Sequence, residues 1–423
     1  MRQAALAAVE PGAAVRRHLK LEPGRLFIGT SRSLPLASEG RVFVVGGGKA
    51  GAAMAGAAHS ILGERIAGGC LAVPALPDFA LAPIEFVRAG HPMPDDGSLA
   101  AGTRIAEILG ETRPGDVVLA LISGGASALL ELPVEGVALA DLQATTQALL
   151  RSGATVVELN TVRKRLSQIK GGGLARLAGP AQVAGLILSD VVGDPVKSIG
   201  SGPTVADTTD PGEARRIVER YGLEPSLPAS VTQAIGAPPP PNFPPQSPVA
   251  NVIVASNALA AAAAVEQARA LGFNAMLLST FVEGEAREVG RVVAGLAKGA
   301  RRHGYPLAPP ACLVLGGETT VTVRGPGAGG RNQEVALAAA IALDGWEQVM
   351  VMTLATDGVD GMSPAAGAAV TGETAGRGRA RGLNARAALD DNDSHGYLAA
   401  LGEAVSTGPT GTNVNDLTFV CVY

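Results

Sequence analysis

The sequence predicts an α/β protein with a parallel sheet covered by helices on both faces, followed by a second α/β part. Three observations support this prediction. Short apolar runs alternate with helix-like stretches along most of the 423 residues, as in βαβ units. Most runs are apolar at every position, which is typical of strands covered on both faces. A proline-rich segment interrupts the pattern at residues 237–248, and the same alternation resumes after it.

The first half of the chain contains four predicted strands separated by helices. Apolar runs such as VVLALI and VAGLIL predict strands at residues 41–45, 70–74, 117–122 and 183–188. The segments between them predict helices over about 49–62, 98–110, 141–152 and 158–178. The N-terminal MRQAALAAVEPGAAVRRHLK lacks a long apolar core and a cleavage pattern, so we expect an amphipathic helix there, not a signal peptide.

A domain boundary is expected at the proline-rich segment. Seven prolines in its twelve residues exclude a helix or a central strand. We assign residues 1–238 to a first domain, 239–248 to a proline-rich linker and 249–423 to a second α/β domain. The second domain contains a predicted helix that ends near 271, another at 284–303 and a third that begins near 331. Its predicted strands lie at 251–256, 274–279, 312–323, 348–355 and 417–422. The sequence leaves open whether the last segment packs back on the first domain.

Composition and charge exclude several classes of partner. Thirty-four basic and 38 acidic side chains give a net charge of −4, and no basic patch argues for nucleic acid. No charged tail argues for a membrane surface, and no run of about 18 strongly apolar residues predicts a membrane span. The three widely spaced cysteines predict a cytoplasmic protein with reduced thiols and no zinc site. The sequence leaves open a homodimer.

The stretch RVFVVGGGKAGAAMAGAA, residues 41–58, raises the first question of function. Gly46, Gly48 and Gly51 satisfy the dinucleotide fingerprint G-x-G-x-x-G, whose free N–H groups attract anions at a helix start. A dinucleotide site needs an acidic residue about 20 positions further on, but the first acid, Asp78, is poorly placed. Lys49 adds a positive charge inside the loop, which favours phosphoryl or carboxylate chemistry over hydride transfer. The structural alternative is a tight turn with a solvated lysine.

Two further polar segments directly follow predicted strands of the first domain. SGGAS, residues 123–127, offers two hydroxyls and several N–H groups, which favours an anion cradle over a plain turn or a covalent serine. SDVVGD places Asp190 and Asp194 at another strand end, where carboxylates serve as a general base or hold Mg²⁺. The structural alternative for both aspartates is an Asx turn or a helix cap.

A cluster of basic residues follows in LNTVRKRLSQIKGGGLA, residues 159–175. Arg163 and Lys170 are seven positions apart, so on one helix they share a face that could hold an anionic substrate. A solvated surface is the ordinary alternative. His91 precedes a proline turn and is expected to be structural.

The second domain contains three more glycine-rich segments. LGGETTVTV and GPGAGGRNQE flank a predicted hairpin-like turn, and Arg331 begins the helix after it. An arginine there is unfavourable for the helix dipole, so we expect a functional reason, such as stabilising charge on a transferring phosphoryl group. ATDGVDG places Asp357 and Asp360 after a strand, and TGPTGTNVNDL forms a long turn that contains Asp416.

Taken together, these motifs resemble the class II glycerate kinases, glycerate 2-kinases with a C-terminal module of the MOFRL type. The resemblance covers about residues 40 to 418, with the module at about 311–418. It implies a larger Rossmann-like, three-layer αβα domain with a mostly parallel sheet, a smaller α/β domain, and an active site in the cleft between them. Two departures are Pro364, where the family usually has an aspartate, and Arg165, where it often has a histidine. The motifs that carry the resemblance are GGGKA, GHPMPD, SGGAS, NTVRK with IKGGGLA, SDVVGDP with GSGPT, GGETTVTV, GGRNQE, TDGVDG and TGPTGTNVNDL.

The resemblance implies transfer of the γ-phosphoryl group of ATP to the 2-hydroxyl of D-glycerate, with a divalent metal such as Mg²⁺. It implies catalytic roles for Lys49, Asp190 and Arg331. We expect Mg²⁺ at Asp190 and Asp194. We expect the substrate or its phosphate at Gly47, Gly48, Ser123, Gly124, Gly125, Ser127 and Arg163, and the nucleotide at Gly316, Gly317, Glu318, Thr319 and Asn332. The alternatives are an NAD(P)H-dependent hydroxypyruvate reductase, a label that members often carry, and a non-catalytic metabolite-binding protein.

Overall fold

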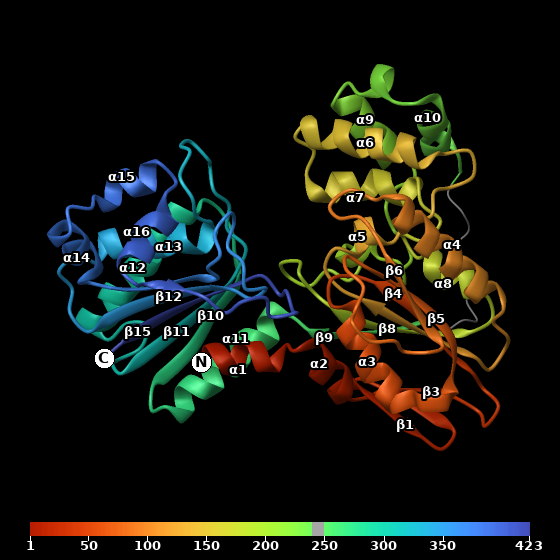
Figure 1. Cartoon of the computed structure of the whole chain (residues 1–423), viewed down its shortest axis with the longest axis horizontal. Coiled ribbons are helices and arrows are strands. Elements are labelled where there is room, and N and C mark those ends of the chain that lie inside the picture. Colours follow the sequence, from red (N-terminus) through yellow and green to blue (C-terminus); the bar gives the residue numbers. More distant parts are fainter. Residues whose placement is uncertain (239–248) are drawn as a thin grey trace. The chain divides into compact units, whose positions relative to one another are not determined.

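The computed structural model describes residues 1–238 and 249–423 (Figure 1). The predicted linker, 239–248, lies outside the described residues. The chain divides into two compact units. The N-terminal unit comprises Pro11–Ser189 and Asp194–Val254, and the C-terminal unit comprises Met1–Glu10, Asp190–Gly193 and Ala255–Tyr423. The first ten residues therefore belong with the C-terminal unit, where the Thr412 hydroxyl donates to the Val9 carbonyl.

The N-terminal unit is built on a six-stranded sheet with the order β6-β5-β4-β7-β8-β9. The pairings of β6 with β5, β5 with β4, β4 with β7 and β7 with β8 are parallel. Gly47 at the end of β4 pairs with Ala72 on one side and Ile122 on the other, so these strands end level with one another. The strands are β4 (Val42–Gly47), β5 (Ile66–Val73), β6 (Ile84–Arg88), β7 (Val117–Ile122), β8 (Gln182–Leu188) and β9 (Val249–Ala255).

Helices cover both faces of this sheet because its strands are apolar on both sides. Leu71 and Val73 of β5 lie beside Gly51 at the start of α3 (Gly51–Leu62), and α2 (Pro11–His18) packs on α3. Cys70 and Ala72, which point the other way, belong to a core with α4 (Asp96–Gly110), α5 (Ala126–Leu129) and α8 (Gly173–Leu177). The expected three-layer Rossmann-like architecture is confirmed.

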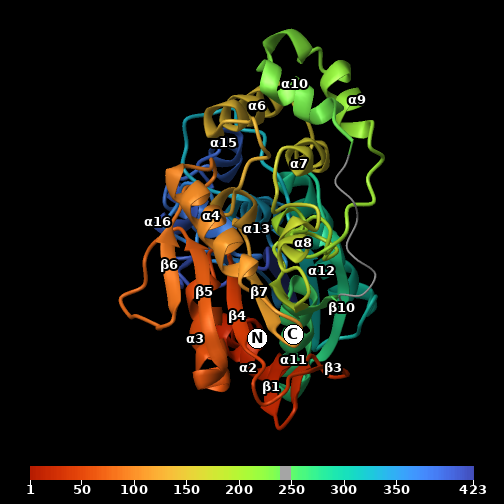
Figure 2. The same cartoon turned by 90° about the vertical axis from the view of Figure 1, so that its right-hand side faces the viewer.

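Two smaller parts complete the N-terminal unit. A three-stranded antiparallel sheet is formed by β1 (Leu19–Glu22), β2 (Arg25–Ile28) and β3 (Arg32–Pro35). A helical group with its own apolar core contains α6 (Leu139–Arg151), α7 (Val156–Arg165), α9 (Glu213–Arg220) and α10 (Ala229–Gly236), and Figure 2 shows these helices together. The core of this group is made by residues such as Leu142, Val162 and Ile217.

The C-terminal unit contains a mixed sheet with the order β10-β11-β15-β12-β13-β14. Only β10 and β11 pair in parallel; β15 runs antiparallel to both of its neighbours, β11 and β12. The last strand of the chain thus lies in the interior of this sheet. The strands are β10 (Asn274–Val282), β11 (Ala311–Gly317), β12 (Val349–Ala355), β13 (Gly367–Thr371), β14 (Ala404–Val405) and β15 (Asp416–Val422).

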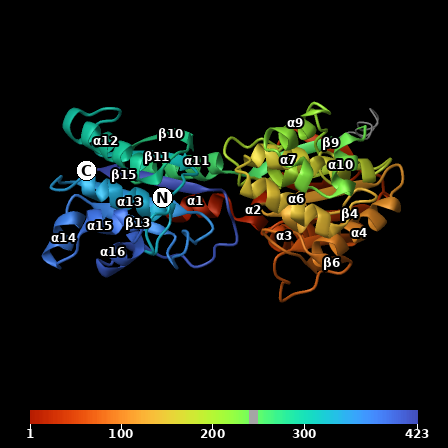
Figure 3. The same cartoon turned by 90° about the horizontal axis from the view of Figure 1, so that it is seen from above.

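Helices also cover both faces of the mixed sheet. Leu313 and Leu315 of β11 belong to the core under α12 (Ala286–His303) and α13 (Arg331–Ala342). Cys312, on the opposite face, contacts Met1, next to α1 (Arg2–Ala8), which packs on α11 (Asn257–Ala270). Figure 3 shows α14 (Thr374–Ala380), α15 (Ala385–Asp390) and α16 (Ser394–Ala400) grouped beside α13. The second α/β domain is therefore also layered.

Three predictions about local structure are wrong. The single helix over 158–178 is two helices: α7 ends at Arg165, and Gly171 and Gly172, directly before α8, have φ angles of 55° and 83°, outside the helical region. Lys170 therefore shares no helical face with Arg163. The strand predicted over 312–323 ends at Gly317, so the hairpin-like turn does not form.

The cysteines and the helices bear on two further expectations, that of reduced thiols and that of no membrane span. Cys70, Cys312 and Cys421 are all buried free thiols. Among the described residues, no helix combines the length and the apolar character needed to cross a bilayer.

Candidate functional site

The glycine loop after β4 uses its own backbone donors within the N-terminal unit. The donors of residues 48–51 are therefore not free to bind an anion, whereas the next two N–H groups at the start of α3, those of Ala52 and Ala53, have no acceptor among the described residues. All four N–H groups at residues 48–51 have protein acceptors: Gly48 N donates to Ala72 O at 3.0 Å, Lys49 N to Gly124 O at 2.8 Å, Ala50 N to Ser123 Oγ at 3.1 Å and Gly51 N to Gly48 O at 3.0 Å. The loop therefore offers a ligand the Lys49 side chain, which is exposed, rather than its backbone.

Gly48 holds the glycine loop against the SGGAS segment. Its φ is 135°, and a Cβ atom at this position would lie 2.1 Å from Ser123 Oγ and 2.7 Å from Ser123 O. Only glycine permits such a close approach. Ser123 is itself 1 % exposed, so the predicted residues Gly47, Gly48 and Ser123 form the structural base of the site.

The SGGAS segment also has free backbone donors. Among the residues that the structure describes, the N–H groups of Gly124, Gly125 and Ser127 have no protein acceptor. Gly125 has a φ of 85° and directly precedes α5. Successive N–H groups in such a turn form an anion-binding concavity. The donors at residues 124–127 are those that the predicted anion cradle needs, and the cradle itself stays a prediction.

Three basic side chains surround this cradle. Lys49 follows β4, and its N–H is bonded to Gly124. Arg163 of α7 is 5 % exposed and donates from Nη2 to Ser127 O at 2.6 Å. His91 approaches from the segment after β6, since a Cβ at Gly125 would lie 3.1 Å from its Cδ2. Partial burial, Lys49 and Arg163 together lower the pKa of His91, so its ring is neutral at pH 7.

The hydroxyl of Ser127 belongs to a buried network. Ser127 Oγ lies 2.8 Å from Ser201 Oγ, which donates to Asn160 Oδ1 at 3.0 Å. This network links the SGGAS segment, the GSGPT segment and α7. It orients the segment that carries the free N–H groups.

The two aspartates of SDVVGD lie after β8. Asp190 follows Ser189, and Asp194 has a φ of 54°. Within residues 1–238 and 249–423, no group of three or more His, Cys, Asp or Glu side chains is arranged to hold a metal ion. A Mg²⁺ ion in a phosphoryl-transfer site commonly takes only one or two protein carboxylates, and phosphate oxygens and water supply the rest. A metal role for Asp190 and Asp194 stays a prediction.

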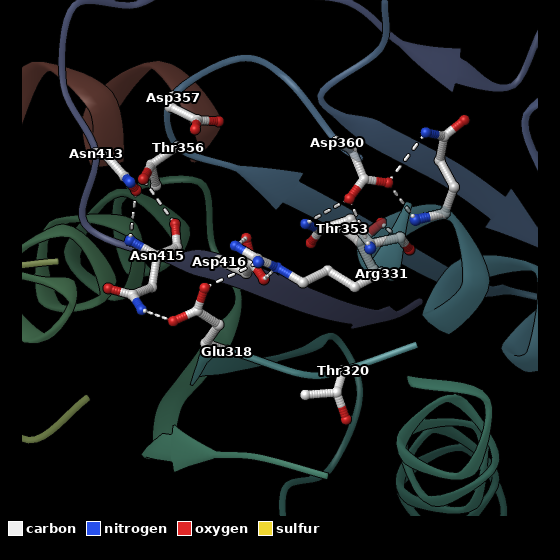
Figure 4. Close-up of polar contacts among 12 residues, drawn as sticks. Glu318, Thr320, Arg331, Thr353, Thr356, Asp357, Asp360, Asn413, Asn415 and Asp416 are labelled. Carbon is white, nitrogen blue, oxygen red and sulfur yellow. Dashed lines mark hydrogen bonds and ion pairs between the residues drawn. The ribbon is translucent and has the colours of Figure 1, made fainter. Parts of the chain in front are cut away.

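Arg331 is the centre of the polar cluster in the C-terminal unit (Figure 4). It begins α13 after Gly330. Its Nη1 lies 2.8 Å from Glu318 Oε1, and its Nε lies 2.5 Å from Asp416 Oδ2. Asn415 Nδ2 donates to Glu318 Oε2 at 2.9 Å, which fixes that carboxylate. Arg331 is thus oriented by two acids from different segments while its side chain stays one-third exposed.

The electrostatics of this cluster are strongly coupled. Burial raises the pKa of Asp416 to about 6, although Arg331 acts to lower it. Burial lowers the pKa of Arg331, but Asp416 and Glu318 outweigh that effect and raise it overall. Arg331 therefore remains charged. The ionised form of Asp416 is stabilised by the neighbouring Arg331.

Asp360 explains how an arginine can begin α13. Its carboxylate is 1 % exposed and accepts the backbone N–H groups of Asn332 at 3.0 Å and Gln333 at 2.8 Å. The side-chain amides of Asn332 and Gln333 also donate to it. A negative charge at the helix start satisfies free N–H groups and complements the dipole. The unfavourable placement of Arg331 is therefore balanced by Asp360.

The structure brings together the residues predicted to bind the nucleotide. Gly316, Gly317, Thr319 and Asn332 line one small cavity beside Asp416, with a volume of about 20 Å³. Glu318 contacts Arg331 next to it. The cavity has room for a single water molecule, so a nucleotide would have to bind outside it. The nucleotide role of these five residues stays a prediction.

Comparison with known proteins places the chain in a family. Residues 1–236 match a family described as a domain of unknown function, DUF4147, and residues 311–416 match the MOFRL family. A D-glycerate 2-kinase of Thermotoga maritima is 43% identical over 391 residues, which cover 91% of each chain. The chain belongs to the class II glycerate kinases. The predicted resemblance is confirmed.

Two further comparisons agree with this membership. The crystal structure of a glycerate kinase from Thermotoga maritima superimposes with a TM-score of 0.90 at 39% identity, and the match covers 100% of this chain and 97% of that one. A relative from Agrobacterium vitis carries the name putative hydroxypyruvate reductase, at 43% identity over 93% of this chain and 90% of that protein. Names of both kinds therefore occur among the relatives of this glycerate kinase family member.

Several residues of the site were not found by sequence reasoning. His91 was expected to be structural, yet it lies beside Gly125 and the two basic residues. Asp416 and Asp360 were noted as acids of glycine-rich turns, but their partners were not foreseen. The available signal is position: Asp416 is the first residue of β15, and Asp360 lies in the loop that follows β12 of the same sheet.

Proposed function

We propose that the protein transfers the γ-phosphoryl group of ATP to the 2-hydroxyl of D-glycerate, which yields 2-phosphoglycerate and ADP. The observation that carries this proposal is the 43% identity to a D-glycerate 2-kinase over 91% of both chains. The name of that relative specifies both the substrate and the hydroxyl. The 39% identical structural neighbour is also a glycerate kinase.

The two polar sites supply what this reaction needs. Phosphoryl transfer relies on positioning and on positive groups that stabilise the charge of the transferring phosphoryl group. The N-terminal unit provides an anion cradle with Lys49 and Arg163, and the C-terminal unit provides Arg331 in a fixed orientation. A carboxylate substrate and a polyphosphate are both anions that such groups bind.

We assign roles to the residues of the site on this basis. Lys49 neutralises oxygens of the phosphate or of glycerate. Asp190 orients or deprotonates the attacking hydroxyl. Arg331 stabilises the developing charge on the phosphoryl group. Mg²⁺, which we assign to Asp190 and Asp194 together with ATP oxygens, neutralises phosphate charge when it is bound.

The proposal is tested by incubating the purified protein with ATP, Mg²⁺ and D-glycerate. We expect ADP release that depends on all three components, and ³¹P and ¹H NMR of the product should show 2-phosphoglycerate. A product phosphorylated at another hydroxyl would still show kinase activity but would refute the assignment of the 2-hydroxyl as the acceptor. No ADP above the rate without glycerate would refute the kinase itself.

The second candidate is an NAD(P)H-dependent hydroxypyruvate reductase, because a relative from Agrobacterium vitis bears that name. The geometry of the glycine loop disfavours it. A dinucleotide site binds the pyrophosphate on N–H groups of the glycine loop and the helix start. Those of residues 48–51 are bonded within the protein, which leaves Ala52 and Ala53 of α3 as the free donors of this segment among the described residues. Oxidation of NADH by hydroxypyruvate without ATP is the measurement that would favour this candidate.

A further inference from the structure

Glu131 and Lys170 form a fully buried ion pair in the N-terminal unit. Their side chains are 0 % and 1 % exposed, and Lys170 Nζ lies 2.5 Å from Glu131 Oε2. Lys170 also donates to Leu130 O at 3.1 Å, and the other carboxylate oxygen accepts from Leu132 N at 3.1 Å. Both charged groups are thus held in one geometry.

Stability alone gives little reason for such a pair. Removing two charges from water costs about as much as their attraction returns, so an apolar pair of similar volume is often as stable. The position of the pair is more informative. Glu131 comes shortly after α5, which carries Ser127, and Lys170 comes shortly after α7, which carries Arg163. The pair therefore joins the two segments that form the Arg163–Ser127 hydrogen bond of the anion cradle.

Arg163 is a buried cation without a carboxylate partner. It is 5 % exposed, its Nε has no hydrogen-bond partner, and it forms no ion pair within the described part of the chain. Burial lowers the pKa of Arg163, although Glu131 favours its charged form. Burial, with a smaller contribution from Arg163, lowers the pKa of Lys170 to about 8, although Glu131 acts to raise it, so both cations are mainly charged at pH 7. Two buried cations thus share one buried carboxylate, and that carboxylate is bonded to Lys170.

A single uncompensated buried cation calls for a monoanion. A buried charge without a partner is costly, so the site is completed by a ligand that supplies one negative charge. The planar guanidinium matches a carboxylate in shape, and a carboxylate carries one negative charge, whereas the triphosphate of ATP carries several. The balance of charge around Arg163 therefore favours the carboxylate of the acceptor over the nucleotide.

We propose that Arg163 binds the carboxylate of a small 2-hydroxy acid, and that Glu131 and Lys170 are positioning residues for it; the proposal rests on the proposed function. Lys170 holds the carboxylate of Glu131 and so keeps it from neutralising Arg163. The pair also fixes α5 relative to α7, which keeps the Arg163 guanidinium beside Ser127. Selectivity for a carboxylate substrate thus depends on two residues that do not touch the substrate.

The test compares K170M, E131Q and the double variant E131Q/K170M with the unaltered protein. In K170M the carboxylate of Glu131 has lost its partner, and its ionised form is expected to pair with Arg163. Since a charge-assisted contact is lost, KM for D-glycerate should rise about 10- to 100-fold at pH 7, where Lys170 of the unaltered protein is mainly charged. KM for ATP should change by less than about twofold.

The double variant separates positioning from mere support of the fold. With both charges removed, Arg163 is again uncompensated, so KM for D-glycerate should return to within about threefold of the original value. A double variant with the same raised KM as K170M would overturn the proposal, as would a K170M whose KM for glycerate is unchanged. Asp116, whose side chain is 5 % exposed and pairs with Arg41 before the start of β7, gives the control. D116N should lower the melting temperature without changing KM for glycerate.

Direct binding distinguishes this proposal from the proposed function. Calorimetric titration with D-glycerate in the absence of ATP measures the affinity without turnover. If the unaltered protein binds glycerate but forms no ADP, the proposed kinase activity is refuted and the role of Arg163 in glycerate binding is not. A K170M variant that binds glycerate as tightly as the unaltered protein refutes the positioning role alone, and an unaltered protein that binds no glycerate refutes both.

Discussion

The pairing of Arg331 with Asp416 leads to a prediction that separates the structural role of Arg331 from its catalytic role. Asp416 is buried, with a side chain 11% exposed, and Arg331 contacts both of its oxygens, at 2.5 Å and 3.3 Å. Replacing Arg331 with Met leaves this carboxylate without its cation. Loss of one partner of a buried pair costs about 3–5 kcal/mol of unfolding free energy. The additional change D416N should recover most of that loss.

The loss of stability in R331M should depend on pH in a defined direction. The folded pKa of Asp416 is already about 6, above the ordinary value of 3.8, and loss of Arg331 raises it further because Arg331 acts to lower it. A carboxyl group with a raised folded pKa binds its proton more tightly in the folded state, so stability falls as pH rises through that pKa. The unfolding free energy of R331M should therefore be close to that of the unaltered protein at pH 5, and the two should differ most at pH 8.

Activity should not follow stability. Arg331 in its assigned role contributes about 10³- to 10⁵-fold to turnover, as arginines that stabilise a transferring phosphoryl group do. Both R331M and R331M/D416N should therefore be inactive, although only the first is unstable. Urea unfolding at pH 5 and pH 8 and ADP release by a coupled assay measure the two effects. Recovery of turnover in the double variant would refute the catalytic role, and failure to recover stability would refute the pairing argument.

Three further predictions concern the same sites. Gly48→Ala should cost at least about 2 kcal/mol of stability, because its Cβ would lie 2.1 Å from Ser123 Oγ at a φ of 135°, and thermal unfolding measures it. Lys49→Ala should lower turnover by orders of magnitude with an unchanged melting temperature, since the side chain is exposed. Asp360→Ala should cost about 2–3 kcal/mol and reduce kcat, because four hydrogen bonds to residues 332 and 333 that hold the start of α13 are lost.

Each of these predictions has a matched control. Gly56→Ala lies in α3, where a Cβ meets nothing within 4 Å, and should leave stability equal or slightly higher. Lys20→Ala removes another exposed lysine of the N-terminal unit and should leave turnover unchanged. Asp357→Ala removes a neighbouring acid whose carboxylate accepts one N–H, that of Val359, within the described part of the chain, and should cost little stability. If any variant and its control behave alike, the corresponding argument fails.

Local sequence patterns carried the prediction of the fold. Runs such as VVLALI at 117–122 became β7 at the predicted bounds, because a strand buried on both faces must be apolar throughout. The helices predicted at 284–303 and from 331 appear as α12 and α13. Prediction failed where glycines decided the backbone: Gly171 and Gly172 divide the helix predicted over 158–178. Apolar spacing alone does not reveal a positive φ.

The candidate site was predicted in part for the same reason. The glycine loop and the SGGAS segment were each predicted to follow a strand, and because parallel strands end at one edge of the sheet, the two segments meet there: Lys49 N donates to Gly124 O. The sequence did not predict that the N–H groups of residues 48–51 are bonded within the protein. That depends on hydrogen bonds between the two loops, and no local pattern specifies them.

By itself, the sequence determined the alternation of strands and helices, the polar segments at strand ends and the membership of a kinase family. Only the tertiary structure decided the partners of the charges: Arg331 with Asp416, 85 residues away, and Lys170 with Glu131, 39 residues away. The physical reason is the distance along the chain over which each effect acts. Hydrophobic periodicity and turn chemistry act over a few residues, whereas the cost of burying a charge is settled by whichever distant side chain the fold brings within hydrogen-bond distance.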